Sequence, residues 1–270
     1  MILHNINPDI FVLGPFHVRF YGVVYAFGFL IAYLLLSYYS KKKLIKNFEE
    51  NNVDIYILWL MFGSIIFARL FEVIFYEPIY YFGNPIKIFF IWEGGLSFHG
   101  GLMGAVIVTY LFCKKKKINF YEIADLLVIP FAMILGFGRM ANFINGELWG
   151  TKSNLPWCVD YSQNQYMYNP PEGCRHPSQI YESFYSFVIF FVLLWLHTKN
   201  KLNKVFPKGF IFWMFVMLYG IFRFIENFWR EDARYFGISI GQYMCFVMII
   251  VSAIFLWKMF KKKIKIKNKN

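Results

Sequence analysis

The stretch that decides the fold reads Gly136-Phe-Gly-Arg-Met-Ala-Asn-Phe-Ile-Asn-Gly-Glu-Leu-Trp-Gly150. On a helix, Arg139, Asn142 and Phe143 share one face, because residues three and four apart are neighbours. The Asn145-Gly146 pair tolerates the left-handed conformation that commonly ends a helix. Arg139 then lies roughly 10 Å below the helix end, at 1.5 Å per residue. If this helix crosses a membrane, the arginine is a charge within the hydrocarbon.

The composition favours a membrane protein. Of 270 residues, 58% are hydrophobic, 23% are aromatic and only 16% are charged, which is far from the balance of a soluble domain. The chain has seven apolar runs long enough to cross a bilayer, at residues 20–39, 55–75, 96–113, 122–144, 179–197, 210–229 and 239–258. We therefore expect an all-α, polytopic integral membrane protein with seven transmembrane helices. The first run has no lysine-rich segment before it and no cleavage site after it, so it does not resemble a signal peptide.

The lysines predict the orientation of these helices, because positively charged loops stay in the cytoplasm. They cluster in alternate connections, at Lys41–Lys43 with Lys46, at Lys114–Lys117, at residues 199, 201, 204 and 208, and in the tail after Trp257. This pattern places the N-terminus outside and the C-terminus in the cytoplasm. It also accounts for the net charge of +12 through contact with anionic lipid, without a nucleic-acid partner.

We expect one membrane-embedded domain, residues 1–270. Its parts are an interfacial arm (1–19), spans one to four (20–144), an extracytoplasmic head (145–178), spans five to seven (179–258) and a basic cytoplasmic tail (259–270). The spacing of Cys158 and Cys174 in the head allows a disulfide but does not establish one. Cys113 and Cys245 are predicted to be apolar residues of membrane helices.

Three ionisable residues from three predicted spans fall in the same outer half of the bilayer. His99 begins one span between two Gly-Gly pairs, while Arg139 and Arg223 each lie about seven residues before an outer helix end. Ionisable residues inside a membrane are expensive and usually functional. A single histidine, by contrast, is often only a packing residue.

Span six carries Tyr219, Arg223, Glu226 and Arg230 at spacings of four, three and four. Such a stripe must face the helix bundle or a water-filled cavity. Arg223 and Glu226 alone would make a structural ion pair, as would Arg69 and Glu72 in span two, but Tyr219 is not needed for that. No His, Cys and Asp cluster has metal-ligand spacing, so we expect no metal and no cofactor.

At these residues the chain resembles the bacterial phosphatidylglycerol:prolipoprotein diacylglyceryl transferase family. The resemblance is carried by Tyr21-Gly22, by Ser97-Phe-His-Gly-Gly101, by Gly138 through Gly150, by Arg175-His-Pro-Ser-Gln-Ile-Tyr-Glu182, and by Tyr219-Gly220 with Arg223 and Arg230. One position departs from it. The family usually has glutamate four residues after the arginine of span six, where this chain has Asn227, preceded by Glu226.

The resemblance implies transfer of the diacylglyceryl group of phosphatidylglycerol to the thiol of the lipobox cysteine of a preprolipoprotein, in the bacterial cytoplasmic (inner) membrane. It implies catalytic roles for His99, Arg139, Tyr219 and Arg223. Substrate contacts are implied for Tyr21, Arg139, Asn142, Asn145, Glu147, Gly150 and Arg230. Either His99 or Tyr219 is the base that takes the thiol proton, and the residue pattern does not choose between them.

Two rival functions fit the sequence less well. An anion permease would use the same arginines, but the chain has no inverted repeat, and its polar residues do not gather at the midplane. An intramembrane protease would need a His-Glu-x-x-His element or a pair of membrane aspartates, which the sequence lacks.

Overall fold

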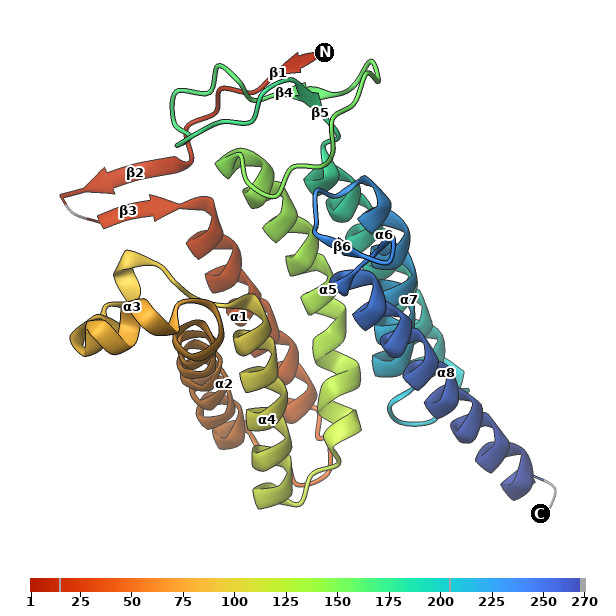
Figure 1. The fold of residues 1–270 in the computed structure, drawn as a ribbon. Coiled ribbons are helices and arrows are strands. Elements are labelled where there is room, and N and C mark those ends of the chain that lie inside the picture. The colour runs from red at the N-terminus through yellow and green to blue at the C-terminus, as the bar shows by residue number, and fades with distance from the viewer. Residues whose placement is uncertain (15, 204, 268–270) are drawn as a thin grey trace. The chain divides into compact units, whose positions relative to one another are not determined.

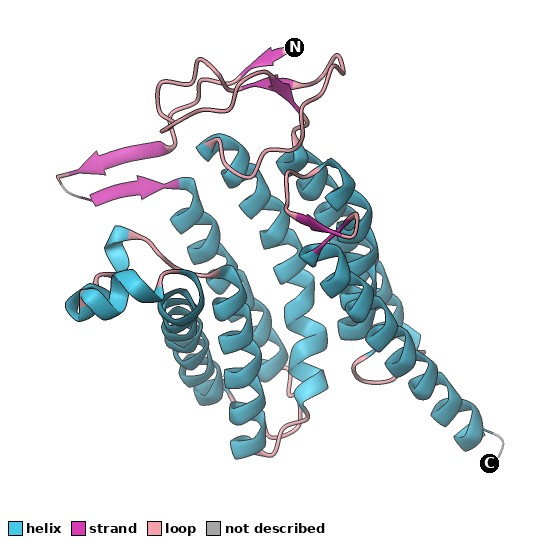
Figure 2. Cartoon of the chain, viewed as in Figure 1, coloured by secondary structure: helices cyan, strands magenta, loops and turns pink. Residues whose placement is uncertain are grey.

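Long helices make up most of the chain, with short strands near the N-terminus and after residue 145 (Figures 1 and 2). The computed structural model describes residues 1–14, 16–203 and 205–267. Two compact units can be distinguished. The larger unit comprises Met1–Gly28 with Leu127–Asn270, and the smaller unit is Phe29–Leu126. Lys204 of a predicted basic loop and residues 268–270 of the predicted tail lie outside the described residues.

The helices follow the predicted apolar runs, with most bounds within five residues, while α6 and α8 extend six and nine residues beyond the predicted C-terminal ends. They are α1 (Phe20–Lys41), α2 (Glu50–Phe71), α4 (Phe98–Lys116), α5 (Phe120–Asn145), α6 (Ser178–Asn203), α7 (Phe210–Glu226) and α8 (Ile240–Lys267). Among the described residues, six helices are long and apolar enough to cross a membrane. The polytopic helical fold is thus confirmed. The exception is α4, which includes His99 and carries three lysines in its last turn, so the count of seven stays a prediction.

Close packing of α2 and α4 forms the core of the smaller unit. Gly104 allows this approach, because a Cβ there would lie 2.6 Å from the Cβ of Phe67. The buried Tyr56 hydroxyl is 2.7 Å from the Thr109 hydroxyl across the same interface. Short helical turns lead from α2 to α4: η1 (Glu72–Tyr76), α3 (Pro78–Gly83), η2 (Pro85–Phe89) and η3 (Ile91–Glu93).

Arg69 at the end of α2 holds these short turns in place. Its guanidinium donates hydrogen bonds to five backbone carbonyls, those of Lys87, Ile88, Phe90, Gly94 and Gly95. The predicted ion pair with Glu72 is therefore wrong as the explanation of this buried charge. Neutral carbonyl dipoles stabilise the charge instead, which satisfies a buried guanidinium equally well.

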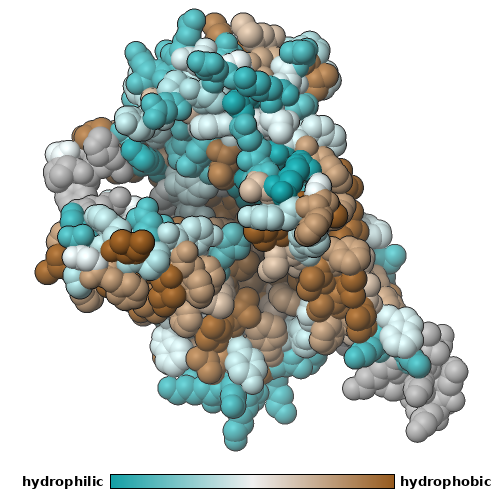
Figure 3. All heavy atoms as spheres, viewed as in Figure 1, coloured by the Kyte–Doolittle hydropathy of each residue, from teal (hydrophilic) through white to brown (hydrophobic). Residues whose placement is uncertain are grey.

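An apolar core shared by α5, α6, α7 and α8 forms the base of the larger unit. Its fully or nearly buried members include Ala132, Ile189, Leu193, Ile211 and Leu256. Exposed apolar side chains such as Met244, Val247 and Ile254 line α8, and Figure 3 shows hydrophobic residues gathered around this helix and hydrophilic ones over the segment of β4 and β5. An apolar exposed face of this extent is typical of contact with lipid.

Short strands organise the N-terminal arm and the head, residues 145–178. In the head, β4 (Val159–Asp160) pairs with β5 (Cys174–Arg175) and, in parallel, with β1 (Ile2–Leu3) of the arm. The rest of the arm is a hairpin of β2 (Asp9–Leu13) and β3 (Phe16–Arg19). A further small hairpin, β6 (Arg234–Tyr235) with β7 (Ile238–Ser239), precedes α8.

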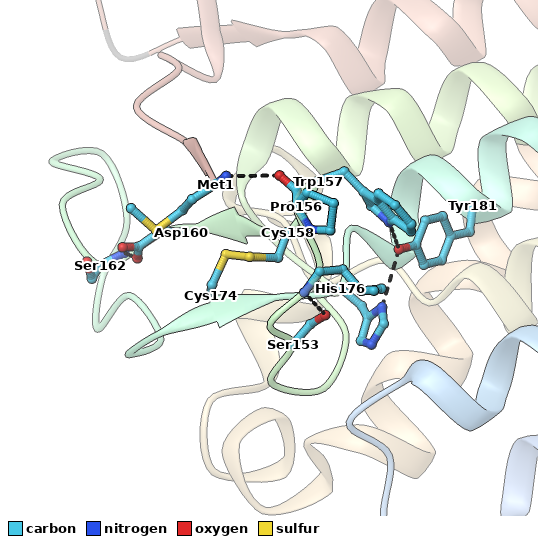
Figure 4. Close-up of a disulfide and its surroundings, with 11 residues drawn as sticks. Met1, Ser153, Pro156, Trp157, Cys158, Asp160, Ser162, Cys174, His176 and Tyr181 are labelled. Atoms are coloured by element: carbon cyan, nitrogen blue, oxygen red, sulfur yellow. Dashed lines mark hydrogen bonds between the residues drawn. A yellow bond between two sulfur atoms is a disulfide. The ribbon is translucent and has the colours of Figure 1, made fainter.

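A disulfide between Cys158 and Cys174 joins the segment before β4 to β5 (Figure 4). This confirms the pairing that the spacing had allowed. Cys113 and Cys245 are free and buried, in α4 and α8, as predicted for apolar residues of membrane helices. The division into an arm, a head and a tail within a single domain stays a prediction.

Candidate active site

The C-terminal end of α5 folds back on itself. Gly146 has a positive φ of 69°, its N–H donates to the Phe143 carbonyl, and the Glu147 N–H donates to the Asn142 carbonyl at 3.1 Å. This pair of bonds is a Schellman motif, which needs a left-handed residue after the helix. The turn places the Glu147 carboxylate beside the Asn142 side chain, 2.8 Å from its amide nitrogen.

A chain of polar contacts runs along this helix end and joins most of the residues predicted to bind substrate. The Asn142 amide nitrogen donates to the Tyr21 hydroxyl at 2.6 Å, and its oxygen accepts from Arg139 at 3.2 Å. Asn145 donates to the same Glu147 oxygen at 3.2 Å. Tyr21, Arg139, Asn142, Asn145 and Glu147 thus form one hydrogen-bonded network in the larger unit.

Glu182 on α6 is the centre of the charged part of the site. Its carboxylate is 1% exposed and contacts three guanidiniums, from three different segments. The distances are 2.9 Å to Nε of Arg139, 2.5 Å to Nη1 of Arg223 and 2.7 Å to Nη1 of Arg230. A single buried carboxylate therefore holds three cations that would otherwise repel one another.

Two further carboxyl groups lie at the edges of this cluster. Glu226 contacts Arg223 at 2.9 Å, and its Oε1 is buried without a hydrogen-bond partner among the described residues. The half-exposed Asp232 contacts Arg230 at 3.3 Å. Arg139 has no second carboxylate among its recorded contacts. Its five N–H donors exceed those that Glu182 and Asn142 use.

The polar stripe predicted on span six is confirmed for its charged members. Arg223 and Glu226 on α7 and Arg230 just after it all belong to the Glu182 cluster. Tyr219 lies one turn before Arg223, and its ring packs against those of Phe215 and Tyr185. An isolated ion pair of Arg223 and Glu226 therefore does not describe the stripe fully, because Arg223 and Arg230 both contact Glu182 on α6.

Gly150 lies where the head meets the segment after α7. Its N–H donates to the His176 carbonyl at 2.9 Å, and a Cβ would overlap the Trp229 carbonyl oxygen and the His176 Cβ. Only glycine fits this close approach of three backbones. Packing thus accounts for the glycine, and its predicted substrate contact stays a prediction.

His99 belongs to the smaller unit and is the second residue of α4, after Phe98. The cap residue is Ser97, whose hydroxyl accepts from the Gly100 N–H. Its Nδ1 is 3.3 Å from the Tyr76 hydroxyl. This contact orients the ring at the start of the helix. The predicted common depth of His99 and the arginines stays a prediction.

A model of the family described as prolipoprotein diacylglyceryl transferase matches residues 8–258. The chain belongs to this family. A phosphatidylglycerol–prolipoprotein diacylglyceryl transferase of Bordetella avium is 38% identical over 249 residues, covering 90% of this chain and 91% of the relative. The relatives of the same name from Oleidesulfovibrio alaskensis and Geobacter sulfurreducens are 36% and 35% identical, covering at least 90% of each chain.

Sequence reasoning missed Glu182, the residue on which the cluster depends. It lies inside the predicted apolar run 179–197 and ends the Arg175–Glu182 stretch of the resemblance, but no site role was predicted for it. An acidic residue within a membrane helix needs a cationic partner, and this signal was available. Ser178 is the first residue of α6, and its hydroxyl donates to the Leu148 carbonyl.

The departure from the family pattern at Asn227 has a structural counterpart. Asn227 is fully buried and its amide donates to the Ser239 hydroxyl, while the adjacent Glu226 reaches Arg223. The carboxylate next to the arginine of α7 is thus supplied from the preceding position. Within the described ranges, no group of three or more His, Cys, Asp or Glu residues could hold a metal ion.

Proposed function

We propose that the cluster of Arg139, Arg223 and Glu182 binds the phosphate of phosphatidylglycerol in this chain. The relatives' names specify phosphatidylglycerol and a prolipoprotein as substrates, and the chain spans nearly their whole length. The main support for this proposal is that three guanidiniums share one buried carboxylate. A phosphodiester can take up the N–H donors that this single carboxylate cannot occupy.

The transfer is a substitution at the glycerol carbon that carries the phosphate. The thiolate sulfur of the lipobox cysteine forms a bond to this carbon, and the carbon–oxygen bond to the phosphate breaks. The thiol proton passes to a base, and the electron pair leaves with the phosphate as sn-glycerol 1-phosphate. The peptide keeps the diacylglyceryl group as a thioether, which is the first step of lipoprotein maturation.

Arginine suits this reaction better than lysine. Its planar fork donates two parallel hydrogen bonds to phosphate oxygens, and it stays charged inside a membrane. Charge accumulates on the phosphate as the carbon–oxygen bond breaks, so cations held in place beforehand stabilise the transition state more than the ground state. Glu182 would hold Arg139 and Arg223 in that geometry through its two oxygens, and Arg230 would stabilise the Oε1 that Arg223 also contacts.

The polar network at the end of α5 offers contacts for the rest of the substrate. Tyr21, Asn142, Asn145 and Glu147 are joined to Arg139 by hydrogen bonds, so a headgroup on the arginine would lie next to them. The Asn145 amide oxygen is buried without a partner in the described part of the chain. It is available to a hydroxyl donor such as the glycerol headgroup.

Two residues remain candidates for the base that takes the thiol proton. Histidine is a common general base, because an unperturbed imidazole titrates close to neutral pH. Tyr219 lies on α7, one helical turn before Arg223. We propose His99 as the base.

The same proposal includes the placement of the chain in the bacterial inner membrane. We propose seven spans, α4 included, with the N-terminus and the head outside and the lysine-rich loops in the cytoplasm. The Cys158–Cys174 disulfide supports an extracytoplasmic head, because disulfides persist in oxidising compartments. The lipobox cysteine of the substrate would reach the site from that side.

An assay with two defined substrates tests the function. The purified protein is mixed with phosphatidylglycerol in detergent micelles and a synthetic lipobox peptide, and mass spectrometry follows the peptide. We expect a mass gain equal to one diacylglyceryl group, and release of glycerol phosphate in equal amount. A peptide with serine in place of the cysteine should gain nothing. Release of glycerol phosphate without a gain on the peptide would indicate a phospholipase and overturn the proposal.

A further inference from the structure

His4 in the N-terminal arm is buried, with 2% of its surface exposed. Its backbone N–H donates to the Asp160 carbonyl beside β4. Its ring has two hydrogen-bond partners in different segments: Nε2 is 2.7 Å from the Phe143 carbonyl at the end of α5, and Nδ1 is 2.7 Å from the Asn164 amide nitrogen in the head. The imidazole thus joins the arm, the head and the helix that carries Arg139.

The hydrogen bonds determine which ring nitrogen carries the proton. The Asn164 amide oxygen accepts from the Tyr166 N–H at 2.8 Å, so the Asn164 nitrogen must face His4. An amide nitrogen only donates, and Nδ1 is therefore an unprotonated acceptor. Nε2 carries the proton and donates it to the Phe143 carbonyl. The ring is neutral and fills both roles at once.

The carbonyl that His4 binds belongs to the turn that forms the site. Phe143 follows Asn142, and its carbonyl also accepts the Gly146 N–H of the Schellman motif. The head packs on the same turn, because a Cβ at Gly146 would lie 2.5 Å from the Met167 sulfur. Displacement of this turn would move the side chains of Asn142 and Glu147 together.

We propose that His4 is a positioning residue for the transfer reaction, which holds the end of α5 through its Nε2–H while neutral. The inference rests on the proposed function, because it assigns Asn142 and Glu147 to substrate binding. It adds a residue outside the membrane that acts on the site through the Phe143 carbonyl. The consequence is a dependence of turnover on the protonation of His4.

Burial of the ring favours its neutral form, while its hydrogen bond to the Phe143 carbonyl acts in the opposite direction. From the head, the Tyr161 ring lies 4.8 Å away between centroids, and burial raises the pKa of this phenol to about 12, so it stays uncharged. The Asp160 carboxylate accepts from the Ser162 N–H, and from α5 the Glu147 carboxylate accepts from Asn142 and Asn145. Burial lowers the pKa of His4 from its usual 6.5.

The sign of the pH effect follows from this direction. Because the pKa of the folded state is lowered, neutral His4 contributes stability above about pH 6.5 and loses it as the pH falls through the lowered pKa. Protonation would set an Nδ1–H against the Asn164 amide hydrogens and push the ring off its partners. His176 also has a pKa lowered by burial, so a variant must identify which histidine is responsible.

Two substitutions separate the two hydrogen bonds of the ring. His4→Gln places an amide nitrogen near the position of Nε2 and keeps a donor for Phe143, while His4→Asn keeps an acceptor for Asn164 and loses the donor. We expect kcat within about threefold of wild type for His4→Gln and roughly 10- to 100-fold lower for His4→Asn, because small misplacements in a site are costly. If His4 only stabilised the head, His4→Gln would be the more impaired.

The pH profile gives a second, independent test. Protonation of the proposed base His99 lowers kcat at acid pH in every variant, so the contribution of His4 is read from the difference: the acid limb should be shallower in His4→Gln than in wild type between about pH 4.5 and 8. Asn164→Asp replaces the donor by an acceptor, so a protonated ring keeps its Nε2–H on Phe143 and the acid limb should move to lower pH. His176→Gln is the control and should leave the acid limb in place.

The outcomes are distinguishable from a failure of the proposed function. Wild-type protein that does not modify the lipobox peptide overturns the function, not only the role of His4. Active wild type with equal kcat in His4→Gln and His4→Asn, or with an Asn164→Asp profile that superimposes on wild type, overturns the positioning role. If His4→Asn does not fold, the Asn164→Asp profile decides alone.

Discussion

Arg69 in the smaller unit and Arg139 in the larger unit are both arginines of predicted membrane helices, but their partners differ in kind. Arg69 donates five hydrogen bonds to backbone carbonyls, and its guanidinium lies 4.6 Å from the Tyr81 ring centroid. Arg139 contacts one carboxylate, which Arg223 and Arg230 share. Neutral dipoles can fill every donor of an arginine, whereas a shared carboxylate leaves donors for a ligand.

The partners of the two arginines distinguish a structural cation from a functional one. Removal of Arg69 would leave several carbonyls without a donor, which would lower the free energy of unfolding. A change at Arg139 would leave the carboxylate with two other cations, so the fold should tolerate it better while the chemistry should not. Substitutions at the candidate bases, at Glu182, at Arg139 and at Arg69 test this contrast.

The largest effect concerns the two candidate bases, one in each unit. His99→Gln should lower turnover by about 100- to 10,000-fold with little loss of lipid binding, because it removes a general base but keeps a hydrogen-bonding side chain. Tyr219→Phe should cost much less. Steady-state kinetics across about pH 6 to 9 decides. Near-normal turnover in His99→Gln together with an inactive Tyr219→Phe would transfer the role to Tyr219, and the chemistry would then lie wholly in the larger unit.

Glu182→Gln should have the next largest effect. The substitution leaves three buried guanidiniums around a neutral amide, and breaking a buried ion pair from one side costs about 3–5 kcal/mol. Thermal unfolding in detergent should show a large drop in stability. Glu231→Gln is the control, because that half-exposed carboxylate also pairs with a buried arginine, Arg175, and should cost about 1 kcal/mol or less. Equal losses in the two variants would contradict a central role for Glu182.

Arg139→Lys should reduce turnover by roughly 100- to 1,000-fold, the size of effect seen when one donor to a developing oxyanion is lost. Lysine keeps the charge but not the planar fork. Unfolding of the variant should differ little from wild type, since a cation still faces Glu182. Arg19→Lys serves as the control, because that exposed arginine pairs with Asp9 on the hairpin. Wild-type turnover in Arg139→Lys would argue against bidentate phosphate binding.

Arg69→Lys should have the smallest effect on chemistry and a measurable one on stability. An ammonium cannot reach all five carbonyls that the guanidinium binds, and each buried group left without a partner costs about 1–3 kcal/mol. We expect a lower unfolding temperature and a specific activity of the folded fraction close to wild type. A loss of turnover as large as that of Arg139→Lys, without destabilisation, would remove the distinction between the two arginines.

Much of the fold could be predicted because a membrane imposes simple rules on sequence. Apolar runs of about 20 residues give the helices, and most observed bounds lie close to the predicted ones, the C-terminal ends of α6 and α8 excepted. The end of α5 was also predicted correctly, because the Asn145-Gly146 pair ends this helix through a left-handed glycine. The strands of the arm and head were not predicted, because they are short and because β1 pairs with β4, a segment far away in the chain.

The chain by itself determined which side chains carry charge into the membrane helices, since Arg139, Arg223 and Glu182 can be read directly within apolar runs. Which groups these charges contact depends on the tertiary structure. Helical spacing predicts that Arg223 pairs with Glu226 and Arg69 with Glu72. In the folded chain, Glu182 on α6 contacts three arginines, and backbone carbonyls accept the hydrogen bonds of Arg69. The physical reason is that a buried charge takes whatever counter-charge or dipole the packing brings within reach, and sequence spacing reports only neighbours on the same helix.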